Sequence, residues 1–220
     1  MTKEELDLIE KAGLLVVGWF LGLLTTAAQK RRRVSTLKKA LEAEIADAKR
    51  WLLLTKLHLE QMLQLCAVGE IASQGPVKIP VPIFATNFAE ATLKLNEGER
   101  GSFNAIYTRI GLVNEHHDKL MELNRIVADD VTRMGELAGE LELYYTNVWT
   151  AIHLIEFHLR NGKNLNKVFN SDPELGLEYY QRIQKQIGDR LMGLANEARD
   201  LGPDKLRQRH ASGGTALTHE

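Results

Sequence analysis

The sequence predicts an all-α protein: one transmembrane helix near the N-terminus continues into a long helix, and an antiparallel cytoplasmic bundle of about four long helices follows. Three observations predict this fold class. Residues 12–28 carry no charged side chain, and the basic residues 30–33 follow them closely. Beyond residue 34, apolar residues recur at steps of three and four, as on one face of a helix. No stretch alternates apolar and polar residues convincingly, so strands are not expected.

The uncharged stretch from Ala12 to Gln29 is predicted to be the transmembrane helix. Its 18 residues lie between Lys11 and Lys30. At ~1.5 Å per residue they extend about 27 Å, close to the ~30 Å thickness of the hydrocarbon core.

The basic cluster after this stretch predicts the orientation, because cytoplasmic flanks carry the excess of Lys and Arg. Residues 1–11 would form a short extracytoplasmic N-terminus, and the rest of the chain would lie in the cytoplasm. The cluster is also expected to contact lipid headgroups. It consists of Lys30, Arg31, Arg32 and Arg33.

Three other interpretations of residues 12–28 remain open. A cleaved signal peptide should begin with a net positive segment, but residues 1–11 hold four acidic residues against two lysines. A buried helix of a soluble protein would carry an apolar stripe, whereas this stretch is apolar on all sides. A helix lying flat in the membrane interface would need a polar face, and this stretch has none.

Small residues spaced by four mark one face of the same helix: Gly18, Gly22 and Thr26. This spacing lets two helix backbones approach closely, so we expect the face to mediate self-association. The alternative is the ordinary glycine content of membrane helices.

The composition fits one anchor and one globular domain. A net charge of −1 gives no indication of nucleic-acid binding. Cys66 is the single cysteine, so no intramolecular disulfide can form, which fits a reducing compartment. We interpret Cys66 as a small core residue.

Residues 34–73 are predicted to form one long helix, and nothing between residues 29 and 34 would separate it from the membrane helix. Its apolar stripe consists of Leu37, Leu41, Ile45, Ala48, Leu52, Leu59, Leu63 and Cys66. The connector 74–86 contains prolines and should be extended. It is unusually apolar, so it is expected either to pack across the bundle or to bind a partner protein. The residues expected to touch such a partner are Ile79, Val81, Ile83 and Phe84.

Capping-box patterns predict the next two helices. Asn87 with Glu90 should begin a short helix, and Asn96 with Glu99 should begin a long one. The stripe of the long helix is Phe103, Ile106, Ile110, Val113, Leu120 and Val127.

The pair Asp129 and Asp130 is expected to mark a break or a bend. A further helix should then run to about Arg160 and end at Asn161-Gly162. Its stripe is Leu137, Leu141, Val148, Ile152, Ile155 and Leu159.

The last helix is predicted to begin at Ser171 or Asp172, with Pro173 at its first position. It should run to about Leu201 and stop at Gly202-Pro203. The cytoplasmic bundle would therefore span residues 30–202. Residues 203–220 lack apolar periodicity and are predicted to be a flexible tail.

The best metal-like pattern is the run Glu-His-His-Asp at residues 115–118, together with residues 153–158. Di-iron bundles use Glu-x-x-His pairs, and this chain offers the reversed spacing, His153-x-x-Glu156. His117 shares an apolar stripe with its neighbours, which favours a hydrogen-bonded core histidine. We therefore predict no metal site, no cofactor and no catalytic residue; His117, His153 and Glu156 are the weak candidates for a metal.

We expect a membrane-anchored protein that acts by binding other proteins, as a scaffold, a tether or a sensor, and not as an enzyme. The expected partners are membrane lipid, one or more proteins and a second copy of the chain, and no nucleic acid. Two alternatives remain: a membrane-active effector that oligomerises through its anchor, and a metal-dependent helical-bundle enzyme.

Overall fold

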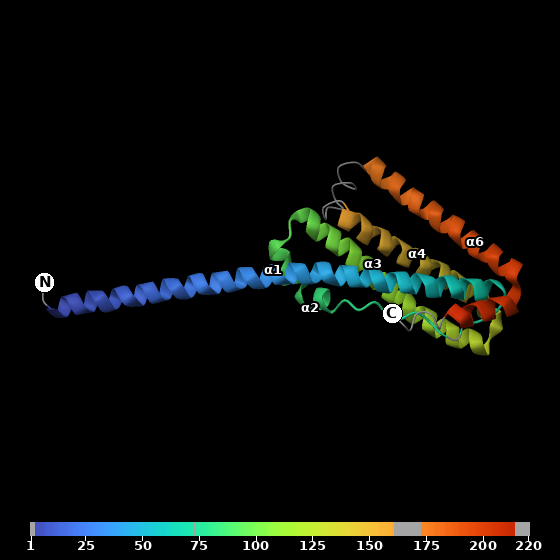
Figure 1. Ribbon diagram of the computed structural model, residues 1–220, viewed down its shortest axis with the longest axis horizontal. Coiled ribbons are helices and arrows are strands. Elements are labelled where there is room, and N and C mark those ends of the chain that lie inside the picture. Colours follow the sequence, from blue (N-terminus) through green and yellow to red (C-terminus); the bar gives the residue numbers. More distant parts are fainter. Residues whose placement is uncertain (1–2, 73, 161–172, 214–220) are drawn as a thin grey trace.

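The computed structural model describes residues 3–72, 74–160 and 173–213, with side chains described in 17–72, 74–160 and 177–210. Within these ranges the chain forms five α-helices and two 3-10 turns and no strand, so the all-α prediction is confirmed. Helix α1 (Lys3–Ala67) runs through the bundle and projects far beyond it (Figure 1). The bundle contains α2 (Pro82–Ala91), α3 (Glu97–Asp129), α4 (Met134–Arg160) and α6 (Pro173–Gly213).

Helix α1 is continuous over 65 residues and includes both the predicted membrane helix and most of the predicted long helix. It ends at Ala67, six residues before the predicted end at Ser73. The cause is Gly69, whose φ of 78° lies in the left-handed region. The amide of Glu70 then donates to the carbonyl of Leu65, with 2.9 Å between the atoms, and closes the last turn.

In the part of the chain whose side chains are described, no helix is long and apolar enough to cross a membrane. The side chains of residues 12–16, the first part of the predicted span, lie outside the described ones. The same holds for the side chains of the predicted N-terminal segment 1–11.

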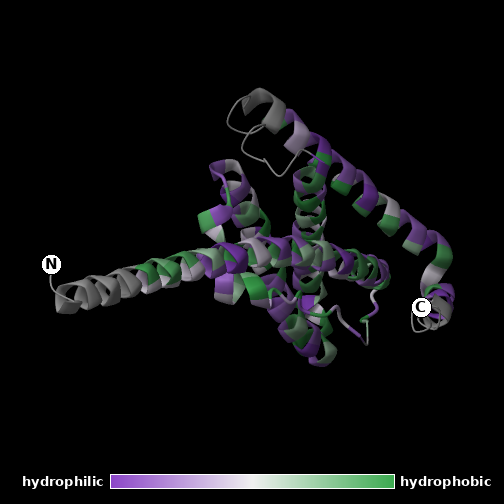
Figure 2. Ribbon diagram, turned by 60° about the vertical axis from the view of Figure 1, so that its left-hand side comes forward, coloured by the Kyte–Doolittle hydropathy of each residue, from purple (hydrophilic) through white to green (hydrophobic). Residues whose placement is uncertain are grey.

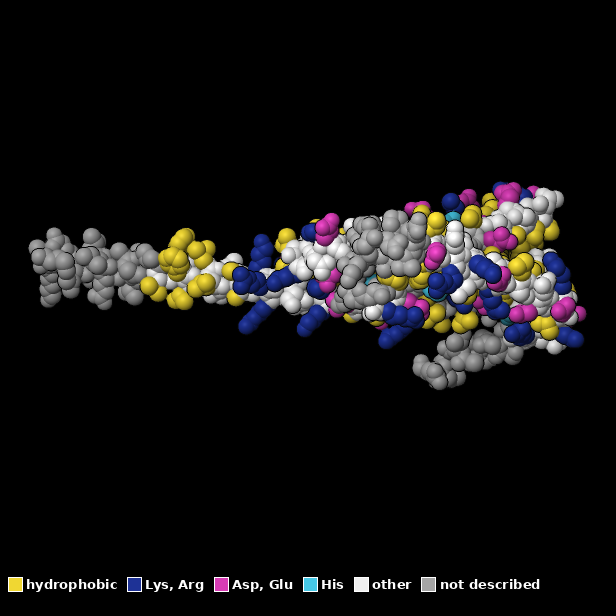
Figure 3. Space-filling model, turned by 90° about the horizontal axis from the view of Figure 1, so that it is seen from above, with side chains coloured by type: hydrophobic (Ala, Val, Ile, Leu, Met, Phe, Trp, Pro, Cys, Tyr) yellow, Lys and Arg dark blue, Asp and Glu magenta, His cyan; other side chains and the backbone are white. Residues whose placement is uncertain are grey.

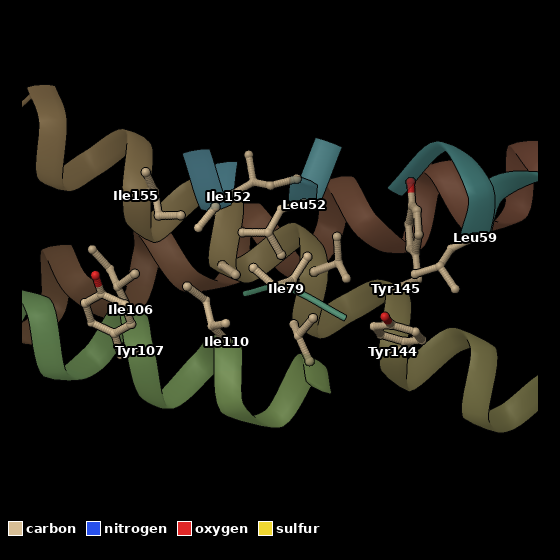
Figure 4. Close-up of a cluster of buried hydrophobic side chains, with 14 of the residues drawn as sticks. Leu52, Leu59, Ile79, Ile106, Tyr107, Ile110, Tyr144, Tyr145, Ile152 and Ile155 are labelled. Atoms are coloured by element: carbon tan, nitrogen blue, oxygen red, sulfur yellow. The ribbon is translucent and has the colours of Figure 1, made fainter. Parts of the chain in front are cut away.

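The core forms where α4 packs against both α1 and α3, and α6 packs against α1 and α4. Figure 1 shows the four helices side by side in the bundle. Apolar side chains from these helices meet in one cluster (Figure 4). The predicted stripes supply most of it, including Leu52 and Leu59 of α1, Ile106 and Ile110 of α3, and Ile152 and Ile155 of α4. Leu159 is the exception in its stripe, because it is 49% exposed.

The short helix α2 begins at Pro82, five residues before the predicted cap Asn87, which lies inside the helix. The reason is a cap that comes from another helix. The backbone N–H groups of Ile83 and Phe84 donate to the carboxylate of Glu44 on α1, at 2.5 Å and 3.0 Å. A local cap residue is therefore not needed at this N-terminus.

The second capping box is present as predicted. The side chain of Asn96 accepts from the amide of Glu99 at 2.8 Å, and Glu99 accepts from the amide of Asn96 at 3.1 Å. Helix α3 ends at Asp129, and the carboxylate of Asp130 accepts from the amide of Thr132, at 3.1 Å, to start the turn η2 (Val131–Arg133). The predicted break at the two aspartates is confirmed.

Residues 203–213 are helical, which differs from the predicted flexible tail. The chain turns at Gly202, where φ is 71°, and continues in helical conformation. The side chain of Leu206 is fully buried, and Arg207 forms an ion pair with Glu70, so this segment packs back on the bundle. The predicted cap residues Asn161, Gly162, Ser171 and Asp172, and residues 214–220, lie outside the described part.

Candidate functional site

The part of α1 that leaves the bundle presents large apolar side chains to solvent. Their exposed fractions range from 48% at Leu23 to 65% at Leu24. These residues are Val17, Trp19, Phe20, Leu21, Leu23 and Leu24. They form the apolar band on the projecting helix in Figures 2 and 3. Apolar surface of this extent is typical of a segment that lies in lipid or against another protein.

The polar side chains of this segment form their hydrogen bonds inside the helix. The hydroxyl of Thr25 donates to the carbonyl of Leu21, and that of Thr26 to the carbonyl of Gly22, each at 2.8 Å. Neither hydroxyl therefore needs water as a hydrogen-bond acceptor, so both can lie in apolar surroundings.

The predicted self-association face is open. Nothing lies within 4 Å of the point where a Cβ would stand on Gly18 or Gly22. The described part of the chain therefore does not use the two glycines for packing inside one molecule, and the face that they share with Thr26 is accessible to a second helix.

The basic cluster follows the apolar segment directly, as Figure 3 shows in dark blue. Lys30, Arg31, Arg32 and Arg33 are all exposed. Arg33 forms an ion pair with Glu90 of α2, with 2.9 Å between the charged atoms, and so connects the projecting helix to the bundle. In the described part of the chain, no carboxylate pairs with the other three.

The connector packs across the bundle, the first of the two expectations for it. The amide of Ile79 donates to Oδ1 of Asn114 at 2.8 Å, and Nδ2 of Asn114 donates back to the carbonyl of Ile79 at 3.0 Å. The side chain of Ile79 is 2% exposed and packs in the core, so in this structure it is not on the surface that a partner protein would reach.

The other three residues that were predicted to touch a partner protein, Val81, Ile83 and Phe84, do not share one environment. Val81 and Phe84 pack against the core, and the ring of Phe84 stacks on Tyr107 with 3.8 Å between ring centres. Ile83 also touches the core but lines a surface groove between α1 and the connector.

This groove has a volume of about 620 Å³. Apolar residues line it from both sides: Trp51 and Leu54 of α1, and Pro80, Pro82 and Ile83. Trp51 is 41% exposed. Asp47 and Arg50 also line the groove and pair with each other at 3.2 Å. Tryptophan and arginine are enriched at protein interfaces, so the groove is a candidate partner surface.

The three weak metal candidates do not form one cluster in the described part of the chain. His117 lies on α3, where Nε2 contacts the carbonyl of Pro76 at 3.0 Å and Nδ1 contacts Asp118 at 3.2 Å. Glu156 on α4 forms an ion pair with Lys49 at 3.0 Å. His153 lies beside the ring of Trp149, and burial lowers its pKa. The described residues contain no group of three or more metal-ligating side chains.

A half-buried ionic network connects three helices on another side of the bundle. Oε2 of Glu60 on α1 accepts from Arg190 of α6 at 2.8 Å, and Oε1 accepts from the hydroxyl of Tyr145 on α4 at 2.7 Å. Arg190 also pairs with Glu197 at 3.1 Å. Burial raises the pKa of Glu60, but hydrogen bonds from Arg190 and Tyr145 and the charge of Lys56 outweigh it and lower the pKa. The network therefore holds α6 against α1 and α4.

The interpretation of Cys66 as a core residue fits its surroundings. Its thiol contacts the sulfur of Met134 at 3.6 Å. Burial and the nearby charge of Glu142 raise its pKa, which disfavours the reactive thiolate.

Sequence reasoning missed Glu44 and the turn η1 (Thr92–Lys94). Glu44 had a detectable signal, because it sits beside Ile45 and Leu41 on the apolar side of its helix. Such a position for a carboxylate requires a buried partner. Nothing local in the sequence indicated that η1 lies against α1.

No protein-family model matches this sequence, and comparison with curated proteins and with solved structures found no similar protein.

Proposed function

We propose that this protein is a membrane-anchored helical bundle that acts by binding other proteins, with residues 12–29 as its single membrane-spanning helix. The observation that carries the proposal is the exposed apolar segment of α1, which projects beyond the bundle and ends in the basic cluster. Transfer of such side chains from water to hydrocarbon is favourable by about 25 cal/mol per Å².

The proposed orientation places the bundle in the cytoplasm. Lys30, Arg31, Arg32 and Arg33 lie between the apolar segment and the bundle, and basic residues remain on the cytoplasmic side. The continuity of α1 supports a rigid connection, because the same helix forms the anchor and one side of the core.

The proposed protein partner is the juxtamembrane segment of another membrane protein, bound in the groove beside Trp51. Trp51 lies 18 residues beyond Arg33 on the same helix, which is about 27 Å. Confinement to one plane raises the effective concentration of such a partner. A second copy of the chain is proposed to associate through Gly18, Gly22 and Thr26 in the membrane.

The membrane-active effector would share this anchor and its self-association. Expression of the full chain and of a chain that lacks residues 1–29 separates the two functions. Membrane depolarisation by the full chain alone supports the effector, and harmless localisation of the full chain to membranes supports the binding protein.

Fractionation of cells that express the full chain tests the anchor. The wild-type chain should remain in the membrane pellet after a carbonate wash and be released by detergent. The double variant Leu21→Lys/Leu24→Lys should shift to the soluble fraction, because each lysine at the centre of a span costs about 2.5–3.5 kcal/mol.

The matched control is Leu143→Lys, which changes a leucine of α4 that is 54% exposed on the bundle. This variant should stay in the pellet. A wild-type chain that is monomeric and fully soluble without detergent contradicts the proposal.

A further inference from the structure

A small pocket lies where α1 enters the bundle. Its volume is about 240 Å³, and residues of α1 and η1 line it: Ala27, Lys30, Arg31, Val34, Leu93 and Lys94. Three of these residues carry positive charge and none carries negative charge. Arg33, a neighbour of these residues on α1, is already paired with Glu90.

The turn η1 is fixed in place beside α1. Ala91 and Leu95, the residues on either side of the turn, are buried. The amide of Leu95 donates to the carbonyl of Thr92 at 3.1 Å, and the hydroxyl of Thr92 donates to the carbonyl of Ala89 at 2.7 Å. The backbone of Lys94, one of the residues that line the pocket, is therefore fixed by its buried neighbours.

None of the three cations forms an ion pair with a carboxylate in the described part of the chain. Positive charges brought together from two elements repel each other unless an anion lies between them. An arginine and lysines around one small pocket suit a phosphate group.

Leu93 indicates the source of that phosphate. It is 65% exposed and lies beside Ala27 and Val34 of α1. Ala27, Val34 and Leu93 give the pocket an apolar side next to its cations. An acyl chain would cover such a side, whereas free phosphate would leave it in water.

We propose that this junction pocket binds the phosphate of one anionic phospholipid through Lys30, Arg31 and Lys94, with its acyl chains along Leu93 and the projecting helix. The inference rests on the proposed anchor at residues 12–29, which places the pocket at headgroup depth. Lys94 adds a bundle residue to the lipid contact that the basic cluster alone would make.

Photo-crosslinking in vesicles tests this pocket. The full chain is reconstituted in phosphatidylcholine vesicles that contain a trace of phosphatidylserine with a photoreactive group, and crosslinked peptides are mapped by mass spectrometry. Crosslinks are expected within residues 27–34 and 92–95. Unlabelled phosphatidylserine should compete, and inorganic phosphate at constant ionic strength should not.

Lys94→Gln should lower the crosslinking yield about fivefold, the effect of one basic residue near an anionic surface. Lys94 is chosen because it lies outside the cluster that sets orientation. The control is Lys119→Gln, an exposed lysine about 33 Å further along α3, which should retain the wild-type yield.

Equal yields from Lys94→Gln and the wild type, or equal losses from the two lysine variants, overturn the pocket and leave the anchor intact. Competition by inorganic phosphate overturns the lipid as the source of the phosphate. A wild-type chain that does not sediment with the vesicles refutes the proposed anchor itself.

Discussion

The carboxylate of Glu44 on α1 accepts a hydrogen bond from the hydroxyl of Tyr107 on α3, with 2.7 Å between the oxygens. The same carboxylate receives the first free amides of α2, from Ile83 and Phe84. Burial raises the pKa of Tyr107, and the bond to Glu44 raises it further, so the hydroxyl stays protonated and can donate. One side chain thus joins three helices and one end of the connector.

Replacement of this carboxylate should destabilise the bundle. Glu44→Gln turns one of the two accepting oxygens into an NH2 group, so at least one of the three donors loses its acceptor, which should cost about 2–3 kcal/mol of unfolding free energy. The midpoint of thermal unfolding should fall by about 5–10 °C, measured by circular dichroism of the full chain in mild detergent. Tyr107→Phe should cost about 1 kcal/mol.

The exposed Glu115 of α3 provides the control for this variant. Glu115→Gln should leave the midpoint unchanged. An equal loss from Glu44→Gln and Glu115→Gln would show that the three-helix contact contributes little.

The Glu60–Arg190 ion pair should make the docking of α6 dependent on pH. The pKa of folded Glu60 is lowered, so its contribution is fully present above the ordinary carboxyl pKa and is lost as the pH falls through the folded value. We expect the urea midpoint of the wild type to decrease below about pH 4.5.

Arg190→Met should lower the midpoint at neutral pH and weaken this acid dependence, because Glu60 then lacks its strongest hydrogen-bond donor. Arg182→Met changes an exposed arginine of the same helix and should do neither. Identical acid profiles for the wild type and Arg190→Met would refute the assignment.

Self-association in the membrane should depend on the two glycines. Gly18→Leu/Gly22→Leu should weaken it severalfold, because leucine side chains hold the two backbones apart. Energy transfer between chains labelled at the N-terminal amine, measured in vesicles at several dilutions in lipid, gives the association constant.

Ala27→Leu is the control, because it places a leucine side chain on the opposite face of the helix, about 180° around the axis from Gly18. It should leave the association constant at the wild-type value. Undiminished energy transfer in the double glycine variant would remove this face from the interface.

Partner binding in the groove should depend on Trp51. Trp51→Ala/Leu54→Ala removes most of the exposed apolar wall on α1 but no fully buried side chain. Membrane proteins that crosslink to the wild-type chain and co-purify with it in detergent should be lost from this variant.

The control Leu143→Ala removes an exposed leucine of α4, outside the groove, and should retain the same proteins. If the variant and the wild type recover the same set, the groove does not bind the partner.

Apolar periodicity predicted the helices well, because each stripe is a local property. Nearly every residue of the α3 and α4 stripes is buried. The ends of the helices were less predictable where a residue distant in the sequence determines them. The start of α2 depends on Glu44, which lies 39 residues before Ile83.

In the candidate site, too, some features could be predicted from neighbouring residues and others depend on distant ones. The apolar segment, the basic cluster and the glycine face are readable in consecutive residues, because lipid, unlike a protein core, selects composition over a continuous stretch. Ile79 was predicted to touch a partner because apolar extended segments often do, but Asn114 and the core use it internally. The sequence contains no signal for that competition.

By itself, the sequence determined an all-helical chain with an uncharged segment before a basic cluster, since both follow from the order of neighbouring side chains. Only the tertiary structure decided which charges meet. Arg190 reaches Glu60 across 130 residues, and Lys94 joins Lys30 and Arg31 at the junction pocket. Such contacts depend on how the helices pack in three dimensions, and a one-dimensional pattern does not record the distance between residues on different helices.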